Sequence, residues 1–286
     1  MFPSTFEYYA PSSLQEALSL LGNGNKVLAG GHSLLPLMKL RLAEPAGLVD
    51  IGHLPGLDGI RDEGDTVVIG ARVTHQAVEH SSLLASAVPL LPQTARWVGD
   101  IQVRNRGTIG GSLVHADPGA DLPAAILALD ATLVARDTRG QRHIAAGDFF
   151  QGLLATSLAD EELLTEIRVS KLPAGTGTAY QKFPNPASRY AIVGIAVTIG
   201  LDSAGAIASA AIGVTGLADR PFRAAAAEAA LLGQRPVGQE VAAAAALVPQ
   251  GQEAAGDIHA SPAYRAHLAQ VLAQRAIVEA GALARP

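Results

Sequence analysis

The chain has 286 residues, of which 49% are hydrophobic and 16% are charged. This composition excludes a disordered chain and gives room for one large domain or two to three smaller ones. Lys+Arg 21 against Asp+Glu 26 leave a net charge of −5, which argues against a nucleic-acid partner or an anionic membrane surface. The chain has no cysteine, which excludes disulfides, thiol catalysis and any iron–sulfur cluster held by its own thiolates.

No targeting or membrane segment is recognisable in the sequence. The N-terminal residues lack a basic region followed by a long apolar run. No apolar stretch reaches the roughly 20 residues that a membrane span needs. We therefore expect a cytoplasmic protein without a membrane span.

Residues 1–52 are predicted to form a small unit of strands and helices. Ser13 and Glu16 have the spacing of a capping box at the start of a helix. A short strand over 26–29 leads directly into Gly30 and Gly31, and a helix is expected over 34–42. A further strand is expected over 47–51.

Residues 53–173 are predicted to form a second unit that mixes both element types. The segments 57–61 and 66–71 indicate a hairpin around the turn DEGD, and a helical region is expected over 83–98. A second pair of glycines, Gly110 and Gly111, comes before a predicted helix. Further predicted elements are a helix over 122–129 and strands over 131–136, 141–145 and 163–169.

Residues 174–286 are predicted to form a third domain of the α+β type. The Gly/Thr-rich segment AGTGT, which follows Pro173, is the best candidate for a linker. Strands over 191–201 and 206–214 indicate a small antiparallel sheet, which Ala-rich helices would cover. Ser261 followed by Pro262 is typical of a helix start.

The two glycine pairs are the sequence feature that most clearly indicates a ligand. Tandem glycines at the end of an apolar strand let the backbone pass close to a ligand, and their N–H groups can bind phosphate. Two such loops, each followed by a helix, favour a shared diphosphate ligand over two ordinary tight turns. They are not the G-x-G-x-x-G fingerprint of a Rossmann fold, and no Walker loop is present.

These loops and their surroundings resemble the two flavin motifs of a known family. The segments AGGHSLLP with MKLR, and RNRGTIGGS with HADPGAD, are similar to those of the FAD-binding subunits of molybdenum hydroxylases, the xanthine dehydrogenase family. Within it, the medium subunits of aerobic carbon monoxide dehydrogenases are the most similar group. The segments NPASRYA and SPAYR also resemble that group, so the likeness covers nearly the whole chain in the same order.

The resemblance implies an α+β fold like that of the vanillyl-alcohol oxidase (PCMH-type) flavoproteins. Two lobes would clasp FAD, and a C-terminal α+β domain of the carbon monoxide dehydrogenase flavoprotein type would follow. It also implies two partner chains, a small subunit with iron–sulfur clusters and a large subunit with molybdenum, assembled as a dimer of heterotrimers. The absence of cysteine fits a chain that holds only the flavin.

The resemblance also implies which residues bind FAD. They are the two loops and five further positions: Ala29, Gly30, Gly31, His32, Ser33, Thr108, Ile109, Gly110, Gly111, Ser112, Asp121, Leu163, Leu164, Lys182 and Tyr190.

Several of these residues have a competing structural interpretation. His32 is equally suited to stabilising its loop, and Asp121 is well placed as a helix N-cap. Leu163 and Leu164 suit a strand core. Lys182 suits a solvated strand position, and Tyr190 suits the core.

The function that this predicts is electron transfer by an oxidoreductase subunit, with no catalytic residue and no metal in this chain. FAD would pass electrons from partner iron–sulfur clusters to an external acceptor. A self-contained flavoprotein oxidase or NAD(P)H-dependent reductase of the same fold is the first alternative. A nucleotide-binding or scaffold module without redox function is the second.

Overall fold

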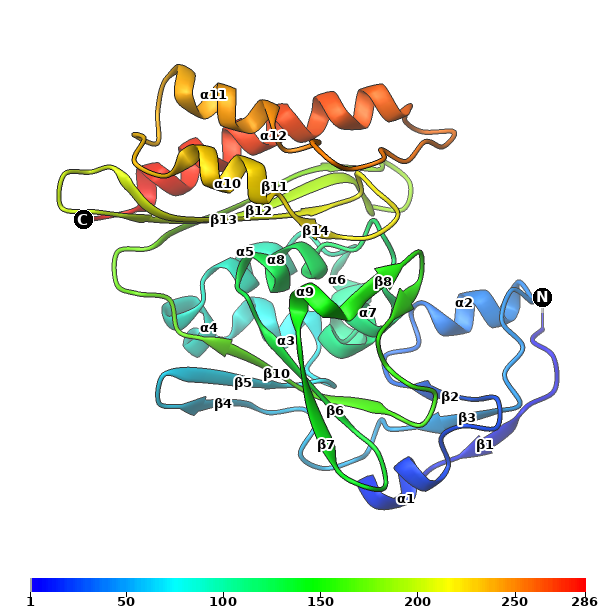
Figure 1. Cartoon of the computed structure of the whole chain (residues 1–286). Coiled ribbons are helices and arrows are strands. Elements are labelled where there is room, and N and C mark those ends of the chain that lie inside the picture. The colour runs from blue at the N-terminus through cyan, green and yellow to red at the C-terminus, as the bar shows by residue number, and fades with distance from the viewer. Residues whose placement is uncertain (1) are drawn as a thin grey trace.

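The computed structural model describes residues 2–286, which form three main sheets, a two-stranded hairpin and the helices around them (Figure 1). The chain passes from one sheet to the next, starting with a small sheet at the N-terminal end. The five-stranded middle sheet follows, and the C-terminal sheet lies at the opposite end of the molecule from the first (Figure 1).

The first sheet has three parallel strands in the order β1-β3-β2. Parallel strands need crossover connections, and two short helices supply them. Ser13 caps the first helix by accepting a hydrogen bond from the Glu16 amide at 3.2 Å. The elements are β1 (Glu7–Tyr9), α1 (Leu14–Ser19), β2 (Asn25–Leu28), α2 (Leu34–Lys39) and β3 (Gly47–Asp50).

The second sheet is antiparallel, with five strands in the order β4-β5-β10-β6-β7. Its strands are β4 (Ile60–Glu63), β5 (Thr66–Gly70), β6 (Thr132–Arg136), β7 (Gln141–Ala145) and β10 (Leu163–Ser170). The helices between them are α3 (His75–His80), α4 (Ser82–Ala87), α5 (Leu90–Ala95), α6 (Ile101–Arg106), α7 (Ile109–His115), α8 (Leu122–Ala128) and α9 (Ala146–Phe149). A small hairpin pairs β8 (Phe150–Gly152) with β9 (Ala155–Thr156).

Two expectations for this region are wrong. The helical region over 83–98 is broken at Val88, whose ψ of 61° leaves the helical range. The cause is Pro89, because proline disfavours a helical conformation in the residue before it. The first strand of the hairpin begins at Ile60 and not at Leu57, whose carbonyl accepts a hydrogen bond from the Arg72 amide at 2.7 Å.

The third sheet is antiparallel, with four strands in the order β11-β12-β13-β14. Helix α12 packs along β11 and β12, and α8 of the preceding region packs on β13. The sheet therefore lies between a helical cover and the middle of the molecule (Figure 1). Its elements are β11 (Gly177–Pro184), β12 (Ala191–Leu201), β13 (Ile207–Thr215), β14 (Phe222–Arg223), α10 (Ala225–Leu231), α11 (Gln239–Ala246) and α12 (Pro262–Leu283).

Strand β12 and the start of α12 are where the sequence predicted them. The predicted linker AGTGT is only partly a connection, because β11 begins inside it at Gly177. This edge strand was not predicted, although it carries residues of the candidate site.

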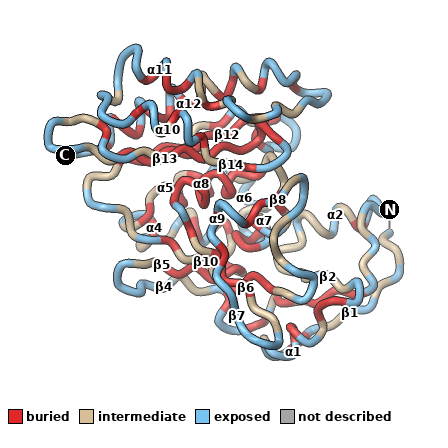
Figure 2. The backbone as a smooth tube through the Cα atoms, in the orientation of Figure 1, coloured by how far each residue is buried: buried red, intermediate tan, exposed pale blue. Residues whose placement is uncertain are grey.

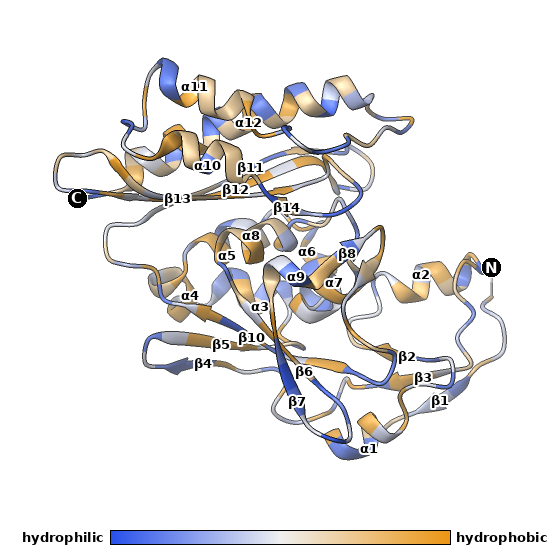
Figure 3. Cartoon of the chain, in the orientation of Figure 1, coloured by the Kyte–Doolittle hydropathy of each residue, from blue (hydrophilic) through white to orange (hydrophobic). Residues whose placement is uncertain are grey.

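Buried side chains form three clusters, one with each sheet (Figure 2). The apolar residues lie on the inner strands and on the helix faces turned toward them, whereas the outer surfaces are more polar (Figure 3). The cores are built mainly from Ala, Leu, Val and Ile, with Phe149 as the largest fully buried side chain.

Candidate functional site

The two glycine loops lie against each other. Gly30 is packed so closely on the second loop that a Cβ atom there would collide with the Arg106 carbonyl and stand 2.9 Å from the Gly107 Cα. Gly31 has a φ of +78°, a conformation that residues with side chains rarely adopt. Glycine is therefore required at both positions, once for close approach and once for backbone geometry.

The first loop presents unused backbone donors. Within residues 2–286, the N–H groups of Gly30, Gly31, His32 and Ser33 have no hydrogen-bond acceptor. The loop is partly exposed, and Ser33 makes no side-chain cap bond to α2. Successive free amides together with a hydroxyl are the donor set that binds a phosphate or diphosphate.

The second loop differs, because the amides of Ile109, Gly110 and Gly111 are already paired. The Ile109 amide donates to the Val73 carbonyl at 2.9 Å, and the Gly110 amide donates to the Ala71 carbonyl at 2.8 Å. Thr108 caps α7 by accepting from the Gly111 amide at 3.1 Å. Within residues 2–286 the Thr108 N–H has no acceptor, so this loop retains one free amide donor, and its start packs against Gly30 of the first loop.

A cavity of about 260 Å³ adjoins the point where the loops meet. Its lining includes Ala29, Gly30 and Thr108 together with the cations Arg72 and Arg106. The Nε atom of Arg72 is buried and has no hydrogen-bond partner within residues 2–286. Asp58 also lines the cavity and pairs with Arg72 at 2.6 Å, so the cavity offers the unsatisfied Arg72 Nε donor and the Arg106 cation beside the Gly30 amide.

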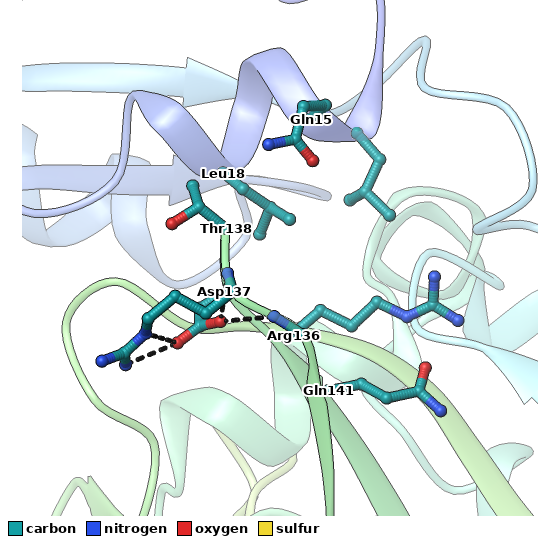
Figure 4. Close-up of a pocket in the computed structure, with 9 residues that line it drawn as sticks. Gln15, Leu18, Arg136, Asp137, Thr138 and Gln141 are labelled. Carbon is teal, nitrogen blue, oxygen red and sulfur yellow. Dashed lines mark hydrogen bonds and ion pairs between the residues drawn. The ribbon is translucent and has the colours of Figure 1, made fainter.

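A larger cavity of about 470 Å³ lies elsewhere, between α1 and the turn that joins β6 to β7 (Figure 4). Its lining residues include Leu18, Arg136 and Gln141, and it contains none of the predicted site residues. We assign the cofactor site to the glycine loops in spite of the smaller cavity volume there, because the free amides lie on the first loop.

A buried ionic group joins the middle region to the third sheet. The Asp121 carboxylate accepts hydrogen bonds from the Tyr180 hydroxyl at 2.6 Å and from Lys182 Nζ at 2.8 Å. Lys182 also donates to the Trp97 carbonyl at 3.1 Å. The side chains of Lys182 and Asp121 are 0% and 5% exposed.

Burial is the largest cause of the pKa shifts in this group. It raises the pKa of Asp121 and lowers the pKa of Lys182, and the attraction between the two charges opposes both shifts. The pKa of Tyr180 is raised well above its usual value by burial and by the Asp121 charge. Asp121 stands at the N-cap of α8 but makes no side-chain cap bond. The N-cap position predicted for Asp121 is confirmed, but its carboxylate binds Tyr180 and Lys182 instead of a helix amide, and the interpretation of Lys182 as a solvated lysine is wrong.

Tyr190 lies beside the first loop and not in the core. It is 40% exposed, and a side chain placed on Gly119 would meet its ring at 3.4 Å. Burial and the nearby Asp117 raise the pKa of Tyr190, whereas the Ser33 hydroxyl lowers it. Tyr190 therefore joins the third sheet to the loop that carries the free amides.

Leu163 and Leu164 are core residues of β10. They are 4% and 3% exposed, and Leu163 packs in the cluster of the first sheet together with Leu18 and Val49. Their burial supports the interpretation as strand core. Among the residues of the second loop, Thr108, Ile109 and Gly110 are buried as well.

Two residues of the site were missed in the sequence. His75 is 4% exposed, and its N–H group donates to the Gly107 carbonyl at 3.0 Å. Burial lowers the pKa of His75 to about 4, with smaller contributions from the charges of His32 and Arg104. Tyr180 is the other; its spacing of two from Lys182 places both side chains on one face of a strand, which is a signal that could have found it.

Within residues 2–286, the structure holds no group of three or more His, Cys, Asp or Glu side chains that could bind a metal ion. Across the same residues, none of the helices is both long and apolar enough to cross a membrane.

Two family models together cover most of the chain. The FAD binding domain in molybdopterin dehydrogenase matches residues 4–172. The CO dehydrogenase flavoprotein C-terminal domain matches residues 178–280. The chain therefore belongs to the FAD-binding subunits of the molybdenum hydroxylase family.

Individual relatives define its place in the family more closely. The chain is 40% identical to the carbon monoxide dehydrogenase medium chain of Hydrogenophaga pseudoflava, over 97% of both chains. It is 37% identical to the 6-hydroxypseudooxynicotine dehydrogenase complex subunit alpha of Paenarthrobacter nicotinovorans, over 100% of this chain and 98% of that one.

Solved structures agree with this placement. The carbon monoxide dehydrogenase structure from Hydrogenophaga pseudoflava matches with a TM-score of 0.96 at 43% identity, over 100% of both chains. Quinoline 2-oxidoreductase from Pseudomonas putida 86 matches with a TM-score of 0.93 at 34% identity, over 99% of both chains. The predicted family, the α+β flavoprotein fold and the FAD cofactor are confirmed, and the chain is a medium-chain-type subunit of an oxidoreductase.

Proposed function

We propose that this chain transfers electrons through its FAD, from iron–sulfur clusters on a partner chain to an external acceptor. The observation that carries the proposal is the first glycine loop, whose four consecutive free amides are held in place by the second loop. A diphosphate-bearing cofactor matches this donor set. The bound flavin supplies the redox chemistry, because it can exchange electrons singly or in pairs.

The chain's own residues bind and orient this cofactor. Gly30, Gly31, His32 and Ser33 donate N–H groups to the diphosphate. Tyr190 shields the flavin ring from its place beside Ser33. The remaining predicted residues of the second loop, with Asp121, Lys182, Leu163 and Leu164, act mainly by holding these elements in position.

The proposed assembly contains a small iron–sulfur chain and a large molybdenum chain, as a dimer of heterotrimers in the cytoplasm. Two observations support it. The chain lacks cysteine, so it holds no thiolate-bound cluster of its own. The relatives named above are a medium chain and a complex subunit. The proposed domains are residues 1–52, 53–173 and 174–286, each with one of the three main sheets.

The proposal is tested with variants of the complex that cannot bind FAD. Gly31→Val and Gly111→Val should abolish FAD binding, because a branched side chain is strained at φ +78° in the first case and stands 2.7 Å from Thr108 Oγ1 in the second. Gly140→Val is the matched control, since no atom lies within 4 Å of a Cβ at that position.

The readout is the reduction of a dye acceptor by the complex, with carbon monoxide, aldehydes and N-heterocycles tried as substrates. We expect the flavin-free complexes to reduce their iron–sulfur clusters but not the dye. A folded Gly31→Val variant that retains stoichiometric FAD would show that the loop is wrongly assigned. Full dye reduction without flavin would overturn electron transfer through this chain.

A further inference from the structure

A buried histidine beside the second glycine loop is not explained by the hydrogen bonds of its ring. His75 is the first residue of α3 and is 4% exposed. Its Nδ1 atom is buried and has no hydrogen-bond partner within residues 2–286. A buried polar atom without a partner is unfavourable, so the ring contributes at this position in another way.

The ring lies against Gly107, the residue at which the second loop begins. A Cβ atom on Gly107 would stand 2.8 Å from His75 Cδ2 and 3.0 Å from His75 Nε2. Gly107 in turn lies close to the first loop, because a Cβ atom on Gly30 would stand 2.9 Å from the Gly107 Cα. The imidazole, Gly107 and Gly30 thus pack in series, with no side chain at either glycine to separate them.

Backbone pairing ties the start of α3 to the start of the second loop. The His75 amide donates to the Gly107 carbonyl at 3.0 Å, and Thr74 forms an isolated antiparallel bridge with Thr108. The Gly107 amide donates to the Val103 carbonyl at 2.7 Å. The two segments therefore form one unit, in which the ring and Gly107 move together.

The first loop depends on packing, because its own amides do not anchor it. The four N–H groups from Gly30 to Ser33 have no acceptor within residues 2–286. The Gly31 carbonyl accepts from the Leu35 amide at 3.1 Å, but this bond lies within the same segment. The contact of Gly30 with Gly107 therefore fixes the free donors relative to the middle region of the molecule.

The ring of His75 acts through its shape and not through a charge. Burial, with smaller contributions from the charges of His32 and Arg104, lowers the pKa of His75 to about 4. Of the helices packed on α3, α5 has no titratable side chain and α6 carries Arg104 and Arg106. The imidazole is therefore neutral at pH 7, and another flat, uncharged ring should be able to replace it.

We propose that His75 is a positioning residue for FAD, which holds the free amides of the first loop in place through Gly107. This inference rests on the assignment of the FAD diphosphate to the first loop in the proposed function. Without the ring, the start of the second loop can move into the vacated space. The donors of the first loop then no longer converge on one diphosphate.

The test measures FAD binding to the flavin-depleted complex, together with the phosphorus NMR resonances of the bound diphosphate. His75→Ala should weaken FAD binding by about tenfold, because several amide–phosphate hydrogen bonds lengthen at once. It should also move both resonances toward those of free FAD. His75→Phe restores a flat, uncharged ring and should recover most of both effects.

The matched control for packing is Val78→Ala, which truncates a residue of the same helix that is 0% exposed. It should lower the melting temperature without changing FAD affinity or the phosphorus resonances, because Val78 is not among the atoms that face the loop glycines.

A double-mutant cycle tests the contact itself. Gly107→Ala places a methyl group 2.8 Å from the ring and should also weaken FAD binding, whereas Gly140→Ala, where no atom lies within 4 Å of a Cβ, should not. In the His75→Ala background the methyl group has room. The double variant should therefore bind FAD better than the product of the two single losses predicts. The comparison of Gly107→Ala with Gly140→Ala also tests the contact if His75→Ala does not fold.

Several outcomes would overturn the positioning role. Wild-type FAD affinity in His75→Ala or in Gly107→Ala would do so, and so would losses that are independent in the cycle. An equal loss in Val78→Ala would show that FAD affinity follows stability alone, and a failure of His75→Phe to recover binding would exclude a role for ring shape.

The proposed function fails by different results. The first loop is wrongly assigned if a folded Gly31→Val variant retains FAD. Electron transfer through this chain fails if the acceptor is reduced while the wild-type flavin stays oxidised.

Discussion

At the residue scale, the two glycine loops have different roles in the proposed binding site. The first loop has four free amides, whereas three amides of the second loop donate to the Val73 and Ala71 carbonyls and to the Thr108 hydroxyl. The same sequence pattern thus serves two purposes, and only the tertiary contacts distinguish them. The pattern alone predicted a shared diphosphate ligand for both loops, but it could not show which of their amides are already paired within the protein.

Tyr190→Ala tests whether this residue acts on the flavin. At 40% exposure, its loss should cost far less than the roughly 3–5 kcal/mol of a buried aromatic. We expect near-normal melting temperature and FAD content, with a changed flavin reduction potential or a changed rate of reoxidation by an artificial acceptor. An unstable variant with an unaltered potential would instead make Tyr190 a packing residue.

His75 should make the protein sensitive to acid. Its pKa is lowered from 6.5 to about 4 by burial, so folding favours the neutral imidazole. This contribution is complete above about pH 6.5 and is lost as the pH falls toward 4, by about 3 kcal/mol in all.

Urea unfolding at pH 7 and pH 4.5 measures this effect. His75→Gln should reduce the loss of unfolding free energy between the two pH values, while His143→Gln, at an exposed position of β7, should not. A pH dependence that is identical in wild type and His75→Gln would contradict the burial of a neutral His75.

At the element scale, β11 is the edge strand that connects the third sheet to the start of α8. Tyr180 and Lys182 project from the same face of this strand and meet Asp121 at the start of α8. The resemblance identified Asp121 and Lys182 singly, and for Asp121 the position before a predicted helix gave a local N-cap signal as well. Their pairing could not be predicted, since it joins residues 61 positions apart.

Lys182→Met should be strongly destabilising, because it leaves the Asp121 carboxylate buried without its cation. Breaking a buried pair in this way costs about 3–5 kcal/mol. Adding Asp121→Leu should recover most of this loss, since the uncompensated charge is then gone. Lys171→Met removes a more exposed pair with Asp62 and should cost less than about 1 kcal/mol. Chemical denaturation of the four proteins measures these differences; equal losses in Lys182→Met and Lys171→Met would contradict the burial of the pair.

At the scale of the whole molecule, elements that are long or have clear start signals were predicted from the sequence better than short elements. Strand β12 is a long apolar run, and α12 begins with Ser261 followed by Pro262. Both elements lie where expected. Pro89 divides an otherwise continuous helical pattern, and β11 begins within a Gly/Thr-rich segment that favours a linker. The first error arose because the local effect of Pro89 was overlooked, and the second because sheet pairing outweighs the local preference of a Gly/Thr-rich segment.

The central claim is that electrons pass through the FAD of this chain. Rapid anaerobic mixing of the intact complex with its substrate, followed at the iron–sulfur and flavin absorbance bands, tests it most directly. The account predicts that the clusters bleach first, that the flavin is reduced next, and that adding the acceptor reoxidises the flavin. Reduction of the acceptor while the flavin stays oxidised would contradict it.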